Sequence, residues 1–461
     1  MGFMRLGSFA ETISYLESDL FIRPSDFESA SKDKNPLDRF IYFLSLLDNP
    51  QKKFKSVVVS GTSGKGSTTI MLASMLTKAG YKTGQTISPH LEKVTERLVI
   101  NNTQISDNNF VVLINSMVPA IEKMKESIFG LPSYFEILLA AAFVYFASEK
   151  VDIAVVEVGL EGKYDGTNVL EPLAFVLTNI SLDHTTILGE TVEKIAQEAT
   201  DRISYLPKES IVITGETDAN IKKIIQEKCS LSQTTCLYYE KDFFVEDEKI
   251  NKKGSLFTYK NQEITFYNIA LSLIGKYQIE NAALAVTTIL QLKRKGFKTS
   301  ELLIKHALKL VSIPGRFEIR KWQNKTIILD GAHNIAKMQS FLQEITNLFP
   351  KEKKIFIVAF TKGHDAKNMM TQIAKKADFI IATEYSATTD LGKNRSVSVA
   401  ALQQFIHSQY AFTAISLEEA VEKAYAIAKQ QNGIIVVTGS LYLVGKLREY
   451  LYSVHSLKQT E

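Results

Sequence analysis

Eight consecutive residues constrain this chain more than any other feature of its sequence: Gly61-Thr62-Ser63-Gly64-Lys65-Gly66-Ser67-Thr68. They separate a short apolar strand, predicted over residues 56–60, from a helix predicted over residues 65–79 that stops at Gly80. Small residues let backbone N–H groups close around phosphate oxygens, and the helix N-terminus adds a favourable dipole. The segment therefore predicts a phosphate-binding loop on a parallel α/β sheet.

The side chains of this loop suit a nucleotide and its metal ion. Lys65 can reach the β- and γ-phosphates, and the hydroxyl of Ser67 or Thr68 can ligate Mg²⁺. The spacing is unusual, because Val59 stands where the first glycine of such loops is expected and Gly66 is inserted before the hydroxyl residue. A turn that only joins strand to helix is the alternative, and the lysine at the helix start argues against it. The predicted ATP-binding residues of the loop are Gly61, Thr62, Gly64, Lys65, Gly66, Ser67 and Thr68.

Short β-rich runs alternate with helical stretches in the first two thirds of the chain, which is typical of parallel α/β architecture. Residues 152–158 and 173–180 are predicted core strands, and residues 255–267 an antiparallel hairpin appended to the parallel sheet. We expect a P-loop-type central ATPase domain with a parallel sheet over residues 1–312.

A second α/β pattern begins after Ile313-Pro314-Gly315-Arg316. Residues 313–461 are therefore predicted to form a smaller, Rossmann-like C-terminal domain, with Pro314-Gly315 as part of a hinge between the two. Its predicted strands cover residues 326–330, 355–360, 379–383 and 433–438.

Composition excludes several other classes of protein. The chain has 461 residues, of which 45% are hydrophobic and 23% charged, as in a soluble globular protein of two or three domains. Lys+Arg 54 against Asp+Glu 50 leaves +4 without a dense basic block, which argues against a nucleic-acid partner. Two cysteines fit no disulfide framework and indicate a reducing compartment. The N-terminus lacks a signal-peptide core and no run of about 18 apolar residues occurs, so we expect a cytoplasmic protein without a membrane partner.

The loop GTSGKGST resembles the GTNGKGS loop of the folylpolyglutamate synthases and dihydrofolate synthases, which belong to the Mur ligase superfamily. Other segments resemble this family in the family's own order, so the chain is identified as a member. They are Ser88-Pro89-His90-Leu91 with Glu96-Arg97, Tyr134-Phe135-Glu136, Glu157-Val158-Gly159-Leu160, Leu182-Asp183-His184, Pro314-Gly315-Arg316, Asp330-Gly331-Ala332-His333-Asn334 and Thr438-Gly439-Ser440-Leu441-Tyr442.

The resemblance implies an ATP-dependent amide ligase. A substrate carboxylate attacks the γ-phosphate of ATP to give an acyl phosphate, and an incoming amine then displaces phosphate. The implied substrates are a folate or dihydropteroate, L-glutamate and ATP with Mg²⁺, and the implied state is a monomer. Such phosphoryl transfer depends on positioning and charge neutralisation.

The resemblance also implies site residues. Lys65, Arg316 and His184 would be catalytic, with Arg316 arriving when the small domain closes. Further implied ATP contacts are Asn281, Arg316 and Asp330. The implied metal ligands are Ser67, Ser88, Glu157 and His184, although imidazole is an unusual ligand for Mg²⁺. The implied contacts of the pterin-bearing substrate are Ser133, Phe135, Glu136, Tyr164, Asp165 and Gly166. His333 is expected to be structural, and the glutamate-binding residues stay unnamed.

The sequence departs from the family near the second metal. The family carries a carbamylated lysine at a position that is Ala199 here, and the histidine of its HQ pair is Tyr277. Water, substrate, Glu198 or Asp201 could supply the missing oxygen ligand, and Asp201 is favoured because it replaces a glycine of the family. We favour an active folate ligase. A divergent Mur-type ligase for another carboxylic acid and a non-catalytic ATP-binding paralogue are the alternatives.

Overall fold

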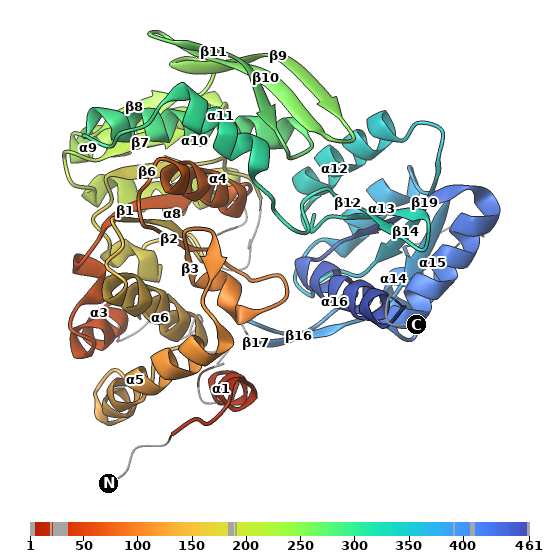
Figure 1. The fold of residues 1–461 in the computed structure, drawn as a ribbon, viewed down its shortest axis with the longest axis horizontal. Coiled ribbons are helices and arrows are strands. Elements are labelled where there is room, and N and C mark those ends of the chain that lie inside the picture. Colours follow the sequence, from red (N-terminus) through yellow and green to blue (C-terminus); the bar gives the residue numbers. More distant parts are fainter. Residues whose placement is uncertain are drawn as a thin grey trace.

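The computed structural model describes residues 5–18, 21, 36–182, 189, 191–390, 392–405 and 411–458. Its two large sheets form separate bodies, one built by the first two thirds of the chain and one by the last third (Figure 1). The chain passes from the first to the second between α11 (Glu301–Leu310) and β12 (Glu318–Trp322). The predicted domain boundary at residue 313 falls in this connection.

The first body contains an eight-stranded sheet in the order β4-β3-β2-β5-β1-β6-β7-β8. Every residue of β1 after Lys55 is buried, as expected for a central strand that is covered on both faces. The strands that pair in parallel are β2 (Thr83–Thr86), β5 (Ile153–Glu157), β1 (Lys55–Ser60), β6 (Ala174–Leu177), β7 (Ile211–Thr214) and β8 (Thr235–Tyr238). The two strands at the antiparallel edge are β3 (Val99–Ile100) and β4 (Thr103–Gln104).

Helices cover both faces of this sheet. Because side chains alternate along a strand, Val58 packs in the core on one face, while Val57 and Val59 pack in the core on the other. The helices that contribute to the first core are α3 (Pro36–Leu46), α5 (Asp107–Glu126), α6 (Tyr134–Ser148), α8 (Val192–Asp201) and α9 (Ala219–Ser232), with α1 (Phe9–Leu16) beside α5. Those that contribute to the second are α4 (Lys65–Lys78), α10 (Lys276–Arg294) and α11.

A three-stranded antiparallel sheet lies over the second face, at the top of Figure 1. It consists of β9 (Phe243–Asn251), β10 (Gly254–Asn261) and β11 (Thr265–Leu271). The predicted hairpin is confirmed as β10 and β11, but it pairs with β9 in a sheet of its own and is not appended to the parallel sheet. Its buried Tyr259 places its hydroxyl 2.9 Å from that of Thr287, so this sheet holds α10 in place.

The second body is a six-stranded sheet in the order β12-β13-β19-β14-β15-β18, parallel except for β12. Its other strands are β13 (Lys325–Leu329), β19 (Gly433–Thr438), β14 (Lys353–Val358), β15 (Phe379–Ala382) and β18 (Ala411–Thr413), which confirms the four predicted strands. Helices α12 (Ile335–Leu348), α13 (Ala366–Ala374) and α14 (Val399–Gln403) cover one face, and α15 (Leu417–Gln431) and α16 (Leu441–Lys458) the other. A separate hairpin joins β16 (Ser386–Thr389) to β17 (Gly392–Arg395).

Gly61 follows β1 with φ +119°, in a region that favours glycine. A Cβ there would lie 2.1 Å from Oγ1 of Thr178 and 2.9 Å from the carbonyl oxygen of Asn179. Gly61→Ala is therefore expected to lower the free energy of unfolding by about 2–4 kcal/mol, because strain and overpacking add. Urea unfolding of the purified protein measures this loss.

Gly80→Ala is the matched control. Gly80 also has a positive φ, +94°, but nothing lies within 4 Å of the position that its Cβ would take. Its expected cost is only about 1 kcal/mol, from backbone strain alone. Equal losses in the two variants would contradict the close packing at Gly61.

Candidate active site

The predicted phosphate-binding loop lies at the carboxyl end of β1 and runs into α4. Gly64 is the N-cap of α4, with φ +89° and no side chain that caps the helix, so the first N–H groups of α4 have no capping partner. The N–H of Thr62 donates to the carbonyl of Asn179 at 2.8 Å, and the N–H of Ser63 to Oδ1 of Asn179 at 3.0 Å. The segment that follows β6 therefore holds Thr62 and Ser63 of the phosphate loop in place.

Lys65 is the first residue of α4, and its side chain folds back over the loop. Its Nζ donates to the carbonyl oxygen of Gly61 at 2.7 Å and lies 3.8 Å from Oε1 of Glu161. The ammonium group is thereby held above the loop, where a phosphate would meet it.

Two glycines let other elements approach the loop closely. A Cβ on Gly64 would lie 2.2 Å from Oδ1 of Asn281, which comes from α10. A Cβ on Gly66 would lie 3.2 Å from Oε2 of Glu157, at the end of β5. The loop thus brings the predicted nucleotide contact Asn281 and the predicted metal ligand Glu157 to one place.

Glu157 places a buried carboxylate next to the phosphate loop. Its carboxylate accepts a hydrogen bond from the N–H of Ser88 at 2.9 Å. Burial raises the pKa of Glu157, although Lys65, the Ser88 N–H and Arg316 oppose the shift. A buried carboxylate of this kind gains most from a cation placed beside it.

The donor chemistry around Glu157 suits Mg²⁺, which prefers hard oxygen ligands and keeps several waters or phosphate oxygens. Glu157 and Ser67 would supply protein oxygens, with Ser88 beside them. Thr68 is fully buried and does not line the cavity described below, so Ser67 is the better of the two predicted hydroxyls. His184 lies outside the described residues. Within those residues, no group of three or more His, Cys, Asp or Glu side chains is arranged to hold a metal.

One cavity of about 690 Å³ joins the loop to the second body. Of the predicted site residues that the structure describes, only Gly61 and Thr68 do not line it. Those that do are Thr62, Gly64, Lys65, Gly66, Ser67, Ser88, Ser133, Phe135, Glu136, Glu157, Tyr164, Asp165, Gly166, Asn281, Arg316 and Asp330. Segments that are far apart in the sequence therefore meet in a single space, and their individual roles stay predictions.

Arg316 and Asp330 form the edge of the cavity where the two bodies join. Oδ2 of Asp330 accepts the N–H of Phe317 at 2.8 Å, and Oδ1 accepts that of Ala332 at 2.9 Å. Burial raises the pKa of Asp330, opposed chiefly by the charge of Arg316. Asp330 therefore ties β13 to the segment that carries Arg316 and keeps the guanidinium next to the cavity.

Two of the predicted substrate contacts already have partners inside the fold. The carboxylate of Glu136 accepts the N–H of Ser133 at 2.7 Å and lies 3.0 Å from Nε of Arg39. The carboxylate of Asp165 accepts N–H groups of Leu160 and Thr167, both at 2.8 Å. Both carboxylates hold the cavity wall in shape, and direct contact of either with substrate stays a prediction.

Phe135 and Tyr164 offer aromatic surface on the same wall. The ring of Phe135 packs against Gly159, where a Cβ would come within 2.3 Å of it. Tyr164 is 45% exposed, and Nζ of Lys163 lies 5.7 Å from the centre of its ring. Both rings line the cavity and could stack on a flat ring system, and their contact with substrate stays a prediction.

An ion pair joins the two bodies beside the cavity, which Asp390 lines. Nη1 of Arg97 lies 2.8 Å from Oδ1 of Asp390, next to the β16–β17 hairpin. Nε of Arg97 donates to Nδ1 of His90 at 3.0 Å, and burial followed by the charge of Arg97 lowers the pKa of His90 to about 3. His90 is therefore neutral at physiological pH, and Asp390 supplies the negative charge that Arg97 needs.

The region of the missing lysine differs from the prediction. Ala199 is buried in the core with Ile195 and Ala196. Asp201, the favoured replacement, instead forms an ion pair with Lys228, with 3.1 Å between Nζ and Oδ1. Glu198 lines the cavity, so it is the better placed of the two carboxylates.

The sequence matches known proteins along nearly its whole length. Residues 59–289 match the family described as Mur ligase middle domain, and residues 316–450 that described as dihydrofolate synthetase, C-terminal domain. The chain is 31% identical to the dihydrofolate synthase/folylpolyglutamate synthase of Bacillus subtilis, over 91% of this chain and 95% of that protein. The chain belongs to the folylpolyglutamate synthase/dihydrofolate synthase family.

Solved structures of folylpolyglutamate synthases have the same fold. The one from Thermotoga maritima superposes with a TM-score of 0.79 at 29% identity, covering 96% of this chain and 97% of that chain. A folylpolyglutamate synthase in complex with AMPPCP and folate superposes with a TM-score of 0.81 at 27% identity, covering 96% and 100%. The predicted two-domain Mur ligase fold is therefore confirmed.

Several cavity residues of this family member were not predicted from sequence. His333, expected to be structural, lines the cavity, and Nζ of Lys337 lies 3.0 Å from its Nε2. Other polar residues on the side of the second body are Ser340, Thr361, His364, Thr389, Asp390, Ser440 and Tyr442. His333 lies in the family motif at residues 330–334, and Ser440 and Tyr442 lie in the motif at residues 438–442. Membership of these motifs could have marked them as cavity residues. The other residues of this group lie in no sequence motif that could have predicted them.

Lys65→Ala is expected to lower ATP-dependent product formation by at least about 100-fold while the protein stays folded, because the loop loses its positive charge toward phosphate. Circular dichroism and single-turnover assays measure the two properties. Lys78→Ala, at the exposed other end of α4, is the control and should keep full activity. Turnover close to that of the unmodified protein in Lys65→Ala would remove Lys65 from this role.

Glu157 generates a pH prediction. Because burial raises its pKa above 4.5, the folded protein binds this proton more tightly than the unfolded chain, and stability falls as pH rises through the folded pKa. Glu157→Gln removes this loss, so its stability relative to the unmodified protein should increase between about pH 5 and pH 8. Urea midpoints at both pH values test this, with the exposed Glu193→Gln as control. A difference that does not change with pH would contradict a dominant effect of burial.

Proposed function

We propose that this protein is an ATP-dependent ligase that adds L-glutamate to a folate through an acyl-phosphate intermediate. The observation that carries the proposal is the single cavity in which Lys65 of the phosphate loop, Glu157 and Arg316 meet. Its volume of about 690 Å³ is in the range that holds nucleotide-sized and drug-sized ligands. The names of the relatives and the AMPPCP–folate complex support the same chemistry.

In the proposed reaction, an oxygen of the folate carboxylate attacks the γ-phosphorus of ATP, and the bond to ADP breaks. The amine nitrogen of glutamate then attacks the acyl carbon, and phosphate leaves. Lys65 and Arg316 neutralise charge on the transferred phosphoryl group, and Ser67 and Glu157 would hold a Mg²⁺ ion that supplies further positive charge. The chain's own part is to position both substrates and to exclude water from the acyl phosphate.

Dihydropteroate is a second proposed acceptor. The Bacillus subtilis relative carries both activities in its name, and two yeast relatives at 29% and 27% identity are named dihydrofolate synthetases. The aromatic wall with Phe135 would contact the pterin ring, which the two acceptors share.

The deciding experiment incubates purified protein with ATP, Mg²⁺ and glutamate together with tetrahydrofolate or dihydropteroate, and detects added glutamyl units by mass spectrometry. Glutamyl addition to tetrahydrofolate supports the first proposal, and formation of dihydrofolate supports the second. Phosphate release with other carboxylic acids only would favour a divergent Mur-type ligase. ADP binding without turnover on any substrate would favour a non-catalytic paralogue.

We further propose that the protein acts as a monomer in the cytoplasm. One chain supplies both walls of the cavity, so no second copy is needed to complete it. Cys229 and Cys236 are both unbridged, in keeping with a reducing compartment. Within the part of the chain that the structure describes, no helix is both long and apolar enough to cross a membrane.

Ala199 generates a prediction about Mg²⁺. Without a lysine to carbamylate, activity should be independent of added bicarbonate and should require more Mg²⁺ than enzymes that keep the lysine. Glu198→Gln should raise the required Mg²⁺ concentration further, because Glu198 faces the cavity, whereas Asp201→Asn should not. Mg²⁺ titrations at controlled bicarbonate measure this. Activity that rises and falls with dissolved CO₂ would show that another lysine carries a carbamate.

A further inference from the structure

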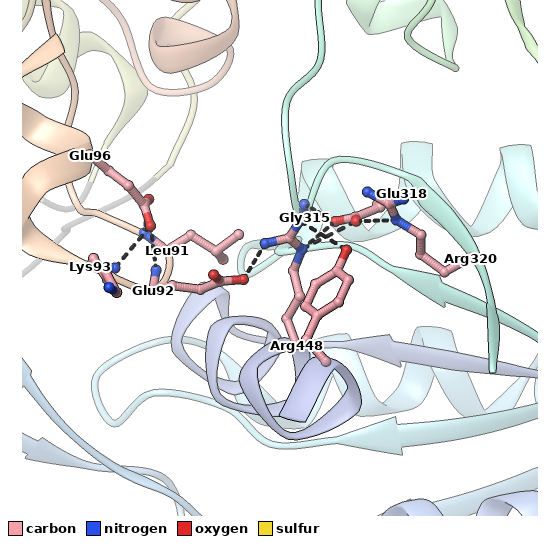
Figure 2. Close-up of polar contacts among 9 residues, drawn as sticks. Leu91, Glu92, Lys93, Glu96, Gly315, Glu318, Arg320 and Arg448 are labelled. Atoms are coloured by element: carbon pink, nitrogen blue, oxygen red, sulfur yellow. Dashed lines mark hydrogen bonds and ion pairs between the residues drawn. The ribbon is translucent and has the colours of Figure 1, made fainter. Parts of the chain in front are cut away.

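A short loop of the first body, residues 88–93, contacts both the nucleotide site and the second body; we call it the docking loop. At its start, the N–H of Ser88 donates to Glu157. Beyond its middle, the N–H groups of Leu91, Glu92 and Lys93 all donate to the carboxylate of Glu96, at 2.7 to 2.9 Å (Figure 2). Three bonds to one carboxylate hold residues 91–93 in one arrangement, and the bond from Ser88 to Glu157 holds the start of the loop.

The middle of the docking loop is inserted into the second body. The side chain of Leu91 packs against the apolar core that includes Val444 and Leu447 of α16. A Cβ on Gly445 would lie 1.9 Å from the carbonyl oxygen of Leu91, and one on Gly315 would lie 3.2 Å from Cδ1 of Leu91. Two glycines of the second body thus leave the space into which Leu91 fits, and one of them is in the predicted hinge.

Arg448 of α16 fixes the end of the docking loop. Its Nη1 forms an ion pair with Glu92, and its Nε lies 3.1 and 3.0 Å from the two carboxylate oxygens of Glu318 (Figure 2). Glu318 also accepts the N–H of Gly315 at 2.8 Å. The side chain of Arg448 is only 12% exposed, so the pair with Glu92 is shielded from water. One guanidinium therefore joins the docking loop, the first strand of the second body and the hinge.

We propose that Arg448 is a positioning residue that couples the orientation of the second domain to the nucleotide site through Glu92 and the docking loop. When the ion pair is intact, Arg316, one residue after Gly315, is held at the cavity, and Ser88 is held on Glu157. When it is broken, the second domain can rotate about the hinge, and the groups from the two domains no longer meet around one phosphate. Small displacements of this kind are costly to turnover, because a misplacement of about 1 Å can lower the rate by about 100-fold. This inference rests on the proposed ligase function.

The experiment compares Glu92→Gln and Arg448→Gln with Arg320→Gln. Nε of Arg320 also binds Glu318, at 2.7 Å, but its side chain is 50% exposed, and both Glu318 and Tyr452, which it contacts, belong to the second domain. Arg320 is therefore the matched control. Both test variants should lower turnover by about 10-fold and leave the Kd for ADP within about threefold, since the phosphate loop is unchanged. The double variant should be no worse than either single variant. Arg448→Lys should restore only part of the turnover, because an ammonium group cannot bind two carboxylates as a guanidinium fork does.

A second readout does not depend on activity. Double electron–electron resonance between labels at the exposed positions 78 and 418, one in each domain, should give a broader distance distribution in Glu92→Gln and Arg448→Gln than in Arg320→Gln. Identical distributions in all three variants would overturn the inference, as would additive losses of turnover in the double variant. If the unmodified protein ligates no substrate, the proposed function fails, and the distance distributions alone decide the inference.

Discussion

The site depends first on how closely the backbone of the phosphate loop approaches the elements beside it. Gly61 lies against Thr178 after β6, and Gly64 lies against Asn281 of α10, in spaces that no side chain could enter. These contacts fix the loop relative to a strand and a helix that come from much later in the chain. The apolar core between the sheet and α10, with the β9–β11 sheet outside it, maintains that geometry. The fold is thus arranged to keep backbone N–H groups and Lys65 aimed at one point.

Carboxylates are buried around that point at a cost in stability. Burial raises the pKa of Glu157, Asp165 and Asp330, which means that the ionised form of each is disfavoured in this environment. Hydrogen bonds from backbone N–H groups offset part of that cost in each case. Such an arrangement is poor for stability and favourable for binding cations and substrates, because its charges need no reorganisation when the ligand arrives.

Local pattern was enough to predict the strands, the phosphate loop and the existence of two α/β units, since these depend on periodicity and on neighbouring residues. It was not enough where a partner comes from far along the chain. Arg39, which engages Glu136, lies 97 residues before it, and nothing near Asp390 indicates that it pairs with Arg97. Whether Glu198 or Asp201 faces the cavity depends on how α8 is rotated about its own axis. Ile195, Ala196 and Ala199 mark the buried face of α8, but only the structure shows which of the two sides next to that face borders the cavity. The antiparallel sheet was misplaced because pairing with β9 leaves no signal in the hairpin itself.

The ion pair between Arg97 and Asp390 links domain movement to the hydration of a buried charge. Arg97 is 3% exposed, and the neutral His90 beside it offers no negative charge, so separating the two domains leaves a guanidinium that must acquire a hydration shell. Opening the molecule is therefore an uptake of water as well as a rotation. Such an opening would respond to water activity: solutes that are excluded from protein surfaces would favour the closed form, and dilute solution the open one. If the domains separate, the osmotic state of the surroundings would act on the accessibility of the site, independently of any ligand.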